Sequence, residues 1–94
     1  MNGDVRVRLS AGMRLQWETA QSAYVMLYPE GMIKLNEPAG EILSRCDGRT
    51  VDALIGDLQQ AFPRADLTAD VITFLEEADS KGWLRTTKGE DDGY

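Results

Sequence analysis

The hydrophobic period of this chain changes once, near Asn36, and that change decides its fold class. Before it, Met13, Leu15 and Trp17 alternate with polar residues, which is the period-two pattern of a half-buried strand. After it, apolar residues recur every three or four positions, as they do on one face of a helix. The sequence therefore predicts an α+β chain in which strands come first and helices follow.

Three strands are predicted within residues 13–35. The segment Ala23–Tyr28 is apolar on both faces, which suits a central strand. Pro29 and Gly31 favour a type I turn followed by a bulge, after which Met32–Leu35 returns as the third strand. We expect a three-stranded antiparallel β-meander with its third strand at one edge.

Three helices are predicted after the meander. Asn36, Thr50 and Thr68 carry side-chain oxygens that can accept a hydrogen bond from a first-turn N–H, so we expect them to be the N-caps. Pro63 ends the second helix and Gly82 ends the third. Apolar positions on one face of each helix supply the core.

The two ends of the chain lie outside this pattern. Residues 1–12 show no sustained period and contain two glycines, so we expect a flexible N-terminal arm. Residues 87–94, with the acidic run Glu90–Asp92, hold no core-forming side chains and are predicted to be a disordered acidic tail. At 94 residues the chain makes one domain, predicted over residues 13–86.

Charge and hydropathy limit the partners. Ten Lys and Arg against sixteen Asp and Glu give a net charge of −6, which disfavours a phosphate backbone, so no nucleic acid is expected. The predicted third helix, which would enter the major groove in a winged-helix protein, has one Lys81 against four acids. These acids are Asp70, Glu76, Glu77 and Asp79. No apolar run reaches the ~20 residues that span a bilayer, and no signal peptide is evident, so we expect a soluble, cytoplasmic protein with no membrane partner.

Candidates for catalysis are few. The chain has no His, which excludes His-ligated metals and nucleophiles activated by His. Its single Cys46 falls on an apolar stripe and is predicted to be a buried structural residue. Trp17 and Trp83 are predicted to fill the core, although indole rings can also stack on a base or cofactor. We expect no catalytic residue, no metal and no cofactor, and therefore no enzyme.

The third strand is the most informative surface. An edge strand carries a row of unpaired backbone groups that invite another chain, and Lys34 is the only residue of Met32–Leu35 that discourages such pairing. Two interpretations remain open at this point. A helix or the N-terminal arm covers the edge, or an extended peptide adds to it as a further strand.

Short motifs along the chain resemble the coenzyme PQQ synthesis protein D family. The resemblance runs from about Leu15 to Leu84 and lies outside residues 1–12 and the acidic tail. The motifs that carry it are Tyr28-Pro29-Glu30-Gly31, Leu35-Asn36, Glu41-Ile42-Leu43, Cys46-Asp47-Gly48 and Thr50-Val51. Members of this family are small peptide chaperones of pyrroloquinoline quinone (PQQ) biosynthesis and precursor-peptide recognition domains.

The resemblance implies a winged-helix-like fold with three strands and three helices. It implies that the leader of a ribosomally made precursor peptide docks as an added strand along the third strand, against the third helix. It further implies a radical SAM maturase as second partner, which joins a Glu and a Tyr of the precursor, while the chaperone does no chemistry and holds no cofactor. The peptide-binding residues expected from this are Met32, Ile33, Lys34, Leu35, Ile72, Phe74 and Leu75.

A second function stays open from the residues alone, namely an acidic winged-helix transcription regulator that acts through protein contacts. The sequence also leaves open whether the chain is a monomer or a homodimer with swapped segments. For the peptide chaperone we expect micromolar binding, about −8 kcal/mol, because an extended leader loses conformational entropy when it docks.

Overall fold

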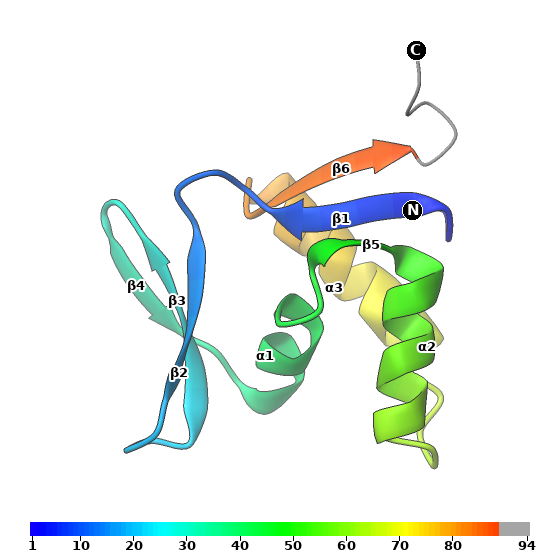
Figure 1. The fold of residues 1–94 in the computed structure, drawn as a ribbon, viewed down its shortest axis with the longest axis horizontal. Helices are drawn as coiled ribbons and strands as arrows, with labels where there is room; N and C mark the ends of the chain where they lie inside the picture. The colour runs from blue at the N-terminus through cyan, green and yellow to red at the C-terminus, as the bar shows by residue number, and fades with distance from the viewer. Residues whose placement is uncertain (89–94) are drawn as a thin grey trace.

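The computed structural model describes residues 1–88 and contains two three-stranded antiparallel sheets and three helices (Figure 1). The α+β class is confirmed. In chain order the elements are β1 (Val5–Leu9), β2 (Arg14–Glu18), β3 (Ala23–Tyr28), β4 (Gly31–Lys34), α1 (Glu37–Leu43), β5 (Asp47–Thr50), α2 (Val51–Ala61), α3 (Thr68–Ser80) and β6 (Leu84–Lys88).

The predicted meander is present as a sheet of order β2-β3-β4. Its register places Leu15 beside Met26, and Met26 beside Ile33. Directly opposed residues of paired strands lie on the same face of a sheet, so these three side chains point the same way, toward the core in which Met26 is fully buried. β4 therefore lies at the edge of its sheet, as the sequence predicts.

The second sheet, of order β5-β1-β6, corrects the expected N-terminal arm. The arm predicted over residues 1–12 is wrong for Val5–Leu9, which form the central strand of this sheet, with Val7 completely buried. Val5, Val7 and Leu9 do alternate with two arginines, but the partner strands come from much later in the chain. Thr87 and Lys88, expected in the tail, belong to β6, and the rest of the predicted tail lies outside the described residues.

Two of the three predicted N-caps are confirmed. Asn36 Oδ1 accepts a hydrogen bond from the Ala39 N–H at 2.9 Å at the start of α1. Thr50 Oγ1 accepts one from the Ala53 N–H at 3.1 Å at the start of α2. Both side chains satisfy a first-turn donor that has no partner within the helix.

The third predicted cap is wrong. Thr68 is the first residue of α3 rather than its cap, and Leu67 occupies the cap position without a side-chain hydrogen bond. Asp66 Oδ1 instead accepts from the Thr68 N–H, at 3.4 Å. The carboxylate two positions earlier in the chain thus accepts from a first-turn N–H, as the threonine hydroxyl was expected to do, and its negative charge is also favoured by the helix dipole.

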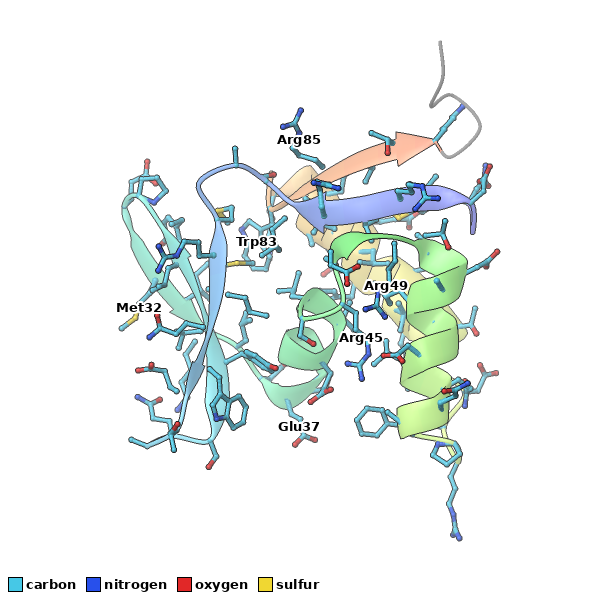
Figure 2. All side chains as sticks on the ribbon, viewed as in Figure 1. Met32, Glu37, Arg45, Arg49, Trp83 and Arg85 are labelled. Carbon is cyan, nitrogen blue, oxygen red and sulfur yellow. The ribbon has the colours of Figure 1, made fainter. Side chains whose placement is uncertain are left out.

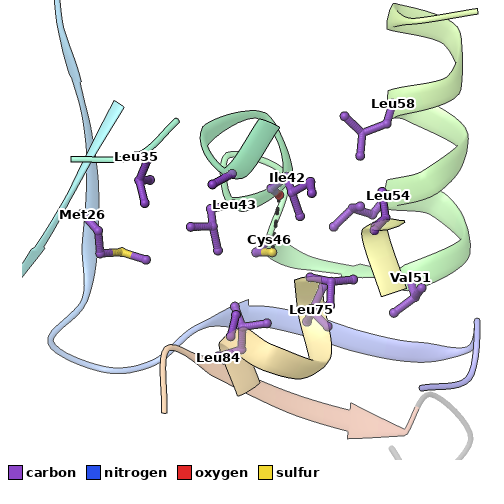
Figure 3. Packing of buried hydrophobic residues seen from close by; sticks show 14 residues of the cluster. Met26, Leu35, Ile42, Leu43, Cys46, Val51, Leu54, Leu58, Leu75 and Leu84 are labelled. Carbon is purple, nitrogen blue, oxygen red and sulfur yellow. Dashed lines mark hydrogen bonds between the residues drawn. The ribbon is translucent and has the colours of Figure 1, made fainter. Parts of the chain in front are cut away.

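The core lies where the helices meet both sheets (Figure 3). Met26 of β3, Leu43 of α1, Leu54 of α2 and Leu75 of α3 are its largest fully buried side chains. α1 lies against β3, and α3 lies against β6, so each sheet has a helix on its inner face. None of the helices within residues 1–88 is long and apolar enough to cross a bilayer.

The two tryptophans differ from one another. Trp17 is 51% exposed, so its predicted place in the core is wrong. Its ring meets Tyr24 of β3 edge to face, with centroids 5.0 Å apart, and that contact keeps the indole on the surface of the meander. Trp83 is half-buried against the core and carries Lys81 Nζ 5.0 Å from its ring centroid.

Two helical glycines give a matched test of this packing. A Cβ on Gly40 of α1 would lie 2.7 Å from Tyr24 Cδ2, so Gly40→Ala should destabilise the protein by about 1–3 kcal/mol through overpacking against β3. Nothing lies within 4 Å of the corresponding atom on Gly56 of α2, so Gly56→Ala should stabilise by about 0.5–1 kcal/mol. Urea unfolding measures both, and shifts of the same sign would contradict the α1–β3 contact.

Candidate functional site

The backbone of β4 offers hydrogen-bonding groups on its outer side. The Leu35 N–H, directly after β4, donates to the Tyr24 carbonyl at 3.0 Å. Because backbone groups of alternate residues in an antiparallel strand point the same way, those of Ile33 also face β3. The N–H and C=O groups of Met32 and Lys34 therefore face away from the sheet.

No other segment within residues 1–88 pairs with this outer edge of β4. The N-terminal segment, one of the expected covers, is used by the other sheet as β1. Of the two interpretations that the sequence leaves open, the described residues therefore favour an edge that can accept a further strand. We call the outward backbone of Met32 and Lys34 the β4 edge.

The side chains of this segment divide between the two faces of the meander. Met32 is 65% exposed and Lys34 is also exposed. Ile33 is half-buried against the core, and Leu35 is buried. Figure 2 shows Met32 on the outer side of the meander, pointing away from the helices. A strand added here would meet one exposed apolar side chain, Met32, together with the aliphatic stem of Lys34.

The residues expected on α3 are less accessible. Leu75 is fully buried in the core, while Ile72 and Phe74 are half-buried and pack against it. The strand closest to α3 is β6. A groove shared by β4 and α3 stays a prediction. Of the three α3 residues expected to bind the peptide, Ile72 and Phe74 are the two whose side chains are partly exposed.

A depression that the sequence analysis missed lies among the three helices. It has a volume of about 290 Å³ and lies between α1, the end of α2 and the start of α3. Its apolar lining includes Phe62, which follows directly after α2 and is 39% exposed. Glu37, Glu41 and Asp70 also line it.

Charged residues between α1 and α2 act structurally. Arg45 donates to Asp57 at 2.5 Å and to Glu41 at 2.9 Å, which ties the end of α1 to α2. Arg49 forms a two-pronged pair with Asp47, and this hydrogen bonding lowers the pKa of the Asp47 carboxyl to about 2. The Asp47 carboxylate is therefore ionised and paired at neutral pH, so it is not available as a general acid.

Cys46 is buried and chemically quiet, as predicted. It is 5% exposed, and its thiol donates to the Ile42 carbonyl at 3.5 Å (Figure 3). Burial, reinforced by the charge of Asp47, raises the pKa of the thiol to about 12. Across the part of the chain that the structure describes, no three His, Cys, Asp or Glu side chains come together to hold a metal ion.

The model for the family "Coenzyme PQQ synthesis protein D (PqqD)" matches residues 23–84, more than half of the chain. The chain belongs to the PqqD family. The matched residues run from β3 to the first residue of β6, so β1 and β2 lie outside the match. The resemblance drawn from the turn, cap and Cys-Asp-Gly motifs is confirmed.

Curated relatives agree with this assignment to the PqqD family. A PqqA binding protein of Stutzerimonas stutzeri is 51% identical over 75 residues, which cover 78% of this chain and 82% of that protein. A PqqA binding protein of Klebsiella pneumoniae is 48% identical over 86 residues, covering 89% of this chain and 94% of the other.

A solved PqqD structure shares the fold. It is the solution NMR structure of the PqqD part of Methylobacterium extorquens PqqCD, described as a functional, stand-alone RiPP recognition element. The TM-score is 0.71 at 32% identity, and the similarity covers 90% of this chain and 94% of the other. The winged-helix-like fold expected for this PqqD chain is thereby confirmed.

The state of Cys46 leads to a test. A pKa raised from 9.0 to about 12 lowers the thiolate fraction at pH 8 about a thousandfold, and burial blocks access as well. We expect the native protein to react with DTNB at least about a thousandfold more slowly than protein unfolded in guanidinium. As a control, a Cys46→Ala, Ser44→Cys variant, with its thiol at an exposed position, should react quickly without denaturant. Fast labelling of native Cys46 would contradict its burial.

Proposed function

We propose that this chain binds the PQQ precursor peptide, PqqA, by adding it as a strand to the β4 edge. In this role it is a peptide chaperone that presents the precursor to a radical SAM maturase for cross-linking of a Glu and a Tyr. The open β4 edge is the observation that carries the proposal, since Met32 and Lys34 direct their backbone groups away from the sheet. The names of the curated relatives support PqqA as the guest.

Strand addition alone accounts for part of the binding free energy. Met32 and Lys34 each offer one donor and one acceptor, so the β4 edge can form four backbone hydrogen bonds. At about 0.5–1.5 kcal/mol each, they contribute roughly 2–6 kcal/mol. Association and the ordering of the leader together cost several kcal/mol, so micromolar affinity needs apolar contacts as well. The exposed Met32 supplies one such contact, and we propose Ile72 and Phe74 of α3 as others.

We further propose that the chain itself is not an enzyme and works in the cytoplasm. The absence of His from the sequence and the raised pKa of the buried Cys46 thiol leave no activated nucleophile among the described residues. A single unpaired cysteine is typical of a reducing compartment. The alternative, a winged-helix regulator that acts through protein contacts, gains no support from the curated relatives, which are named PqqA binding proteins.

An amide NMR titration with synthetic PqqA tests the site. We expect the largest shift changes at residues 32–35 and on α3, because these amides would face or adjoin the added strand. A tenfold change in salt concentration should alter the affinity little, since backbone hydrogen bonds carry no net charge. Shift changes confined to β2, or to the sheet formed by β1, β5 and β6, would overturn the proposed site.

Substitution of Lys34 separates backbone from side-chain binding. Lys34→Pro removes the outward N–H, so PqqA affinity should fall about two- to tenfold, the loss of one hydrogen bond. Lys34→Ala removes the side chain but keeps the N–H, and its affinity should stay within about twofold of the original. Isothermal titration calorimetry measures both. Equal affinities for the two variants would show that the Lys34 N–H takes no part.

A further inference from the structure

The outer face of the β5-β1-β6 sheet gathers positive charge on a chain whose net charge is −6. Arg6, Arg8 and Arg85 surround a depression of about 400 Å³, together with Gly48 and Thr87. The other face of the sheet is turned toward the core, as the burial of Val7 and Leu84 shows. Figure 2 shows Arg85 above β6, pointing away from the helices. We call this outer surface the arginine face.

The strand register brings like charges together. Arg8 lies directly opposite Arg85, and Arg6 lies opposite Thr87. Like charges at directly opposed positions of an antiparallel pair destabilise a sheet. The structure gives neither Arg8 nor Arg85 a carboxylate partner within residues 1–88, whereas Arg45 and Arg49 are both paired. Asp47 lies opposite Arg8 on β5, but its carboxylate is hydrogen-bonded to Arg49. Arg8 and Arg85 therefore face one another with no ion pair of their own within residues 1–88, which favours a ligand that supplies carboxylates.

Gly48 fixes the geometry of the arginine face. Its φ of +104° belongs to the left-handed region that favours glycine, and a Cβ there would lie 2.7 Å from Arg8 Nη2. The missing side chain lets the Arg8 guanidinium lie over β5. The Gly48 carbonyl also accepts a hydrogen bond from Arg6 Nη1 at 3.1 Å. Gly48 thus bonds the Arg6 guanidinium through its carbonyl and leaves room for the Arg8 guanidinium beside it.

We propose that the arginine face binds an acidic, extended segment of a partner protein. Guanidinium groups form two parallel hydrogen bonds with carboxylates, so Arg8 and Arg85 can each hold one Asp or Glu side chain. Carboxylates two positions apart on an extended chain lie about 7 Å from one another, whereas the Cβ atoms of directly opposed residues such as Arg8 and Arg85 lie about 5 Å apart. The long arginine side chains can span this difference. A duplex is the less suitable partner, since the net negative charge of the chain would repel its dense phosphates.

This acidic segment is distinct from the precursor added at the β4 edge. The arginine face belongs to the β5-β1-β6 sheet and the β4 edge to the β2-β3-β4 sheet, and no strand is shared by the two. The proposal therefore holds or fails independently of precursor binding. It gives the protein a second docking surface with a different chemistry.

Fluorescein-labelled hexaglutamate, with anisotropy as the readout at low ionic strength, tests the arginine face on the full chain. We expect saturable binding that falls about tenfold or more in an Arg8→Gln, Arg85→Gln variant. The matched control is Arg14→Gln, Arg64→Gln, which removes the same charge from exposed positions outside the face and should change the affinity less than about twofold. An equal loss in both variants, or no binding to the unaltered chain, overturns the proposal.

A second pair of variants keeps every arginine. Thr87→Asp places a carboxylate inside the depression and should compete with the probe, whereas Thr86→Asp adds the same charge on the opposite side of β6. Hexaglutamate affinity should therefore fall only in Thr87→Asp. A hexathymidylate of similar charge provides the last comparison, and tighter binding of this oligonucleotide than of hexaglutamate would assign the face to phosphates and overturn an acidic protein segment.

Discussion

The pairing of β1 with β5 and β6 is the interaction on which the rest of the structure depends. It joins the N-terminal segment to two segments from much later in the chain and buries Val7 and Leu84 over the helices. Because β1 is engaged there, it does not pair with β4, and the β4 edge stays open within residues 1–88. A loose arm could have added to that edge. The pairing that completes the core thus also leaves the edge free for a guest.

Features of the fold that depend on neighbouring residues could be predicted from the sequence. The meander, its turn and the caps at Asn36 and Thr50 each rest on chemistry within a few positions. Val5–Leu9 shows the same alternation as β2, but its place in a sheet depends on partners far away in the sequence, so local patterns do not distinguish it from an arm. Trp17 shows the opposite limit. The alternation along β2 places its side chain on the same face as Leu15, but no nearby residue reveals that its ring packs on Tyr24 and not in the core.

The candidate sites also combine features set by neighbouring residues with features set by residues far apart in the sequence. Strand order alone predicts that β4 is an edge, but the direction of the Lys34 N–H depends on the hydrogen bond between Leu35 and Tyr24, which no sequence pattern reveals. The arginine face is less predictable still. Arg8 and Arg85 lie at opposite ends of the sequence, and only the register of β1 with β6 places them opposite one another. A surface that is formed by strands far apart in the sequence, such as the arginine face, cannot be predicted from local sequence patterns.

The β4 edge and the arginine face differ in how they respond to solvent. Backbone hydrogen bonds to an added strand involve no net charge, so salt screens them little, whereas pairs between guanidinium and carboxylate groups weaken once the Debye length falls to about 8 Å at physiological ionic strength. The two surfaces lie on separate sheets that share one core, so neither sheet has to give up a strand for both surfaces to be used. A rise in salt therefore weakens binding of an acidic partner at the arginine face more than binding of a peptide at the β4 edge. The two surfaces can thus take up and release their partners independently of one another.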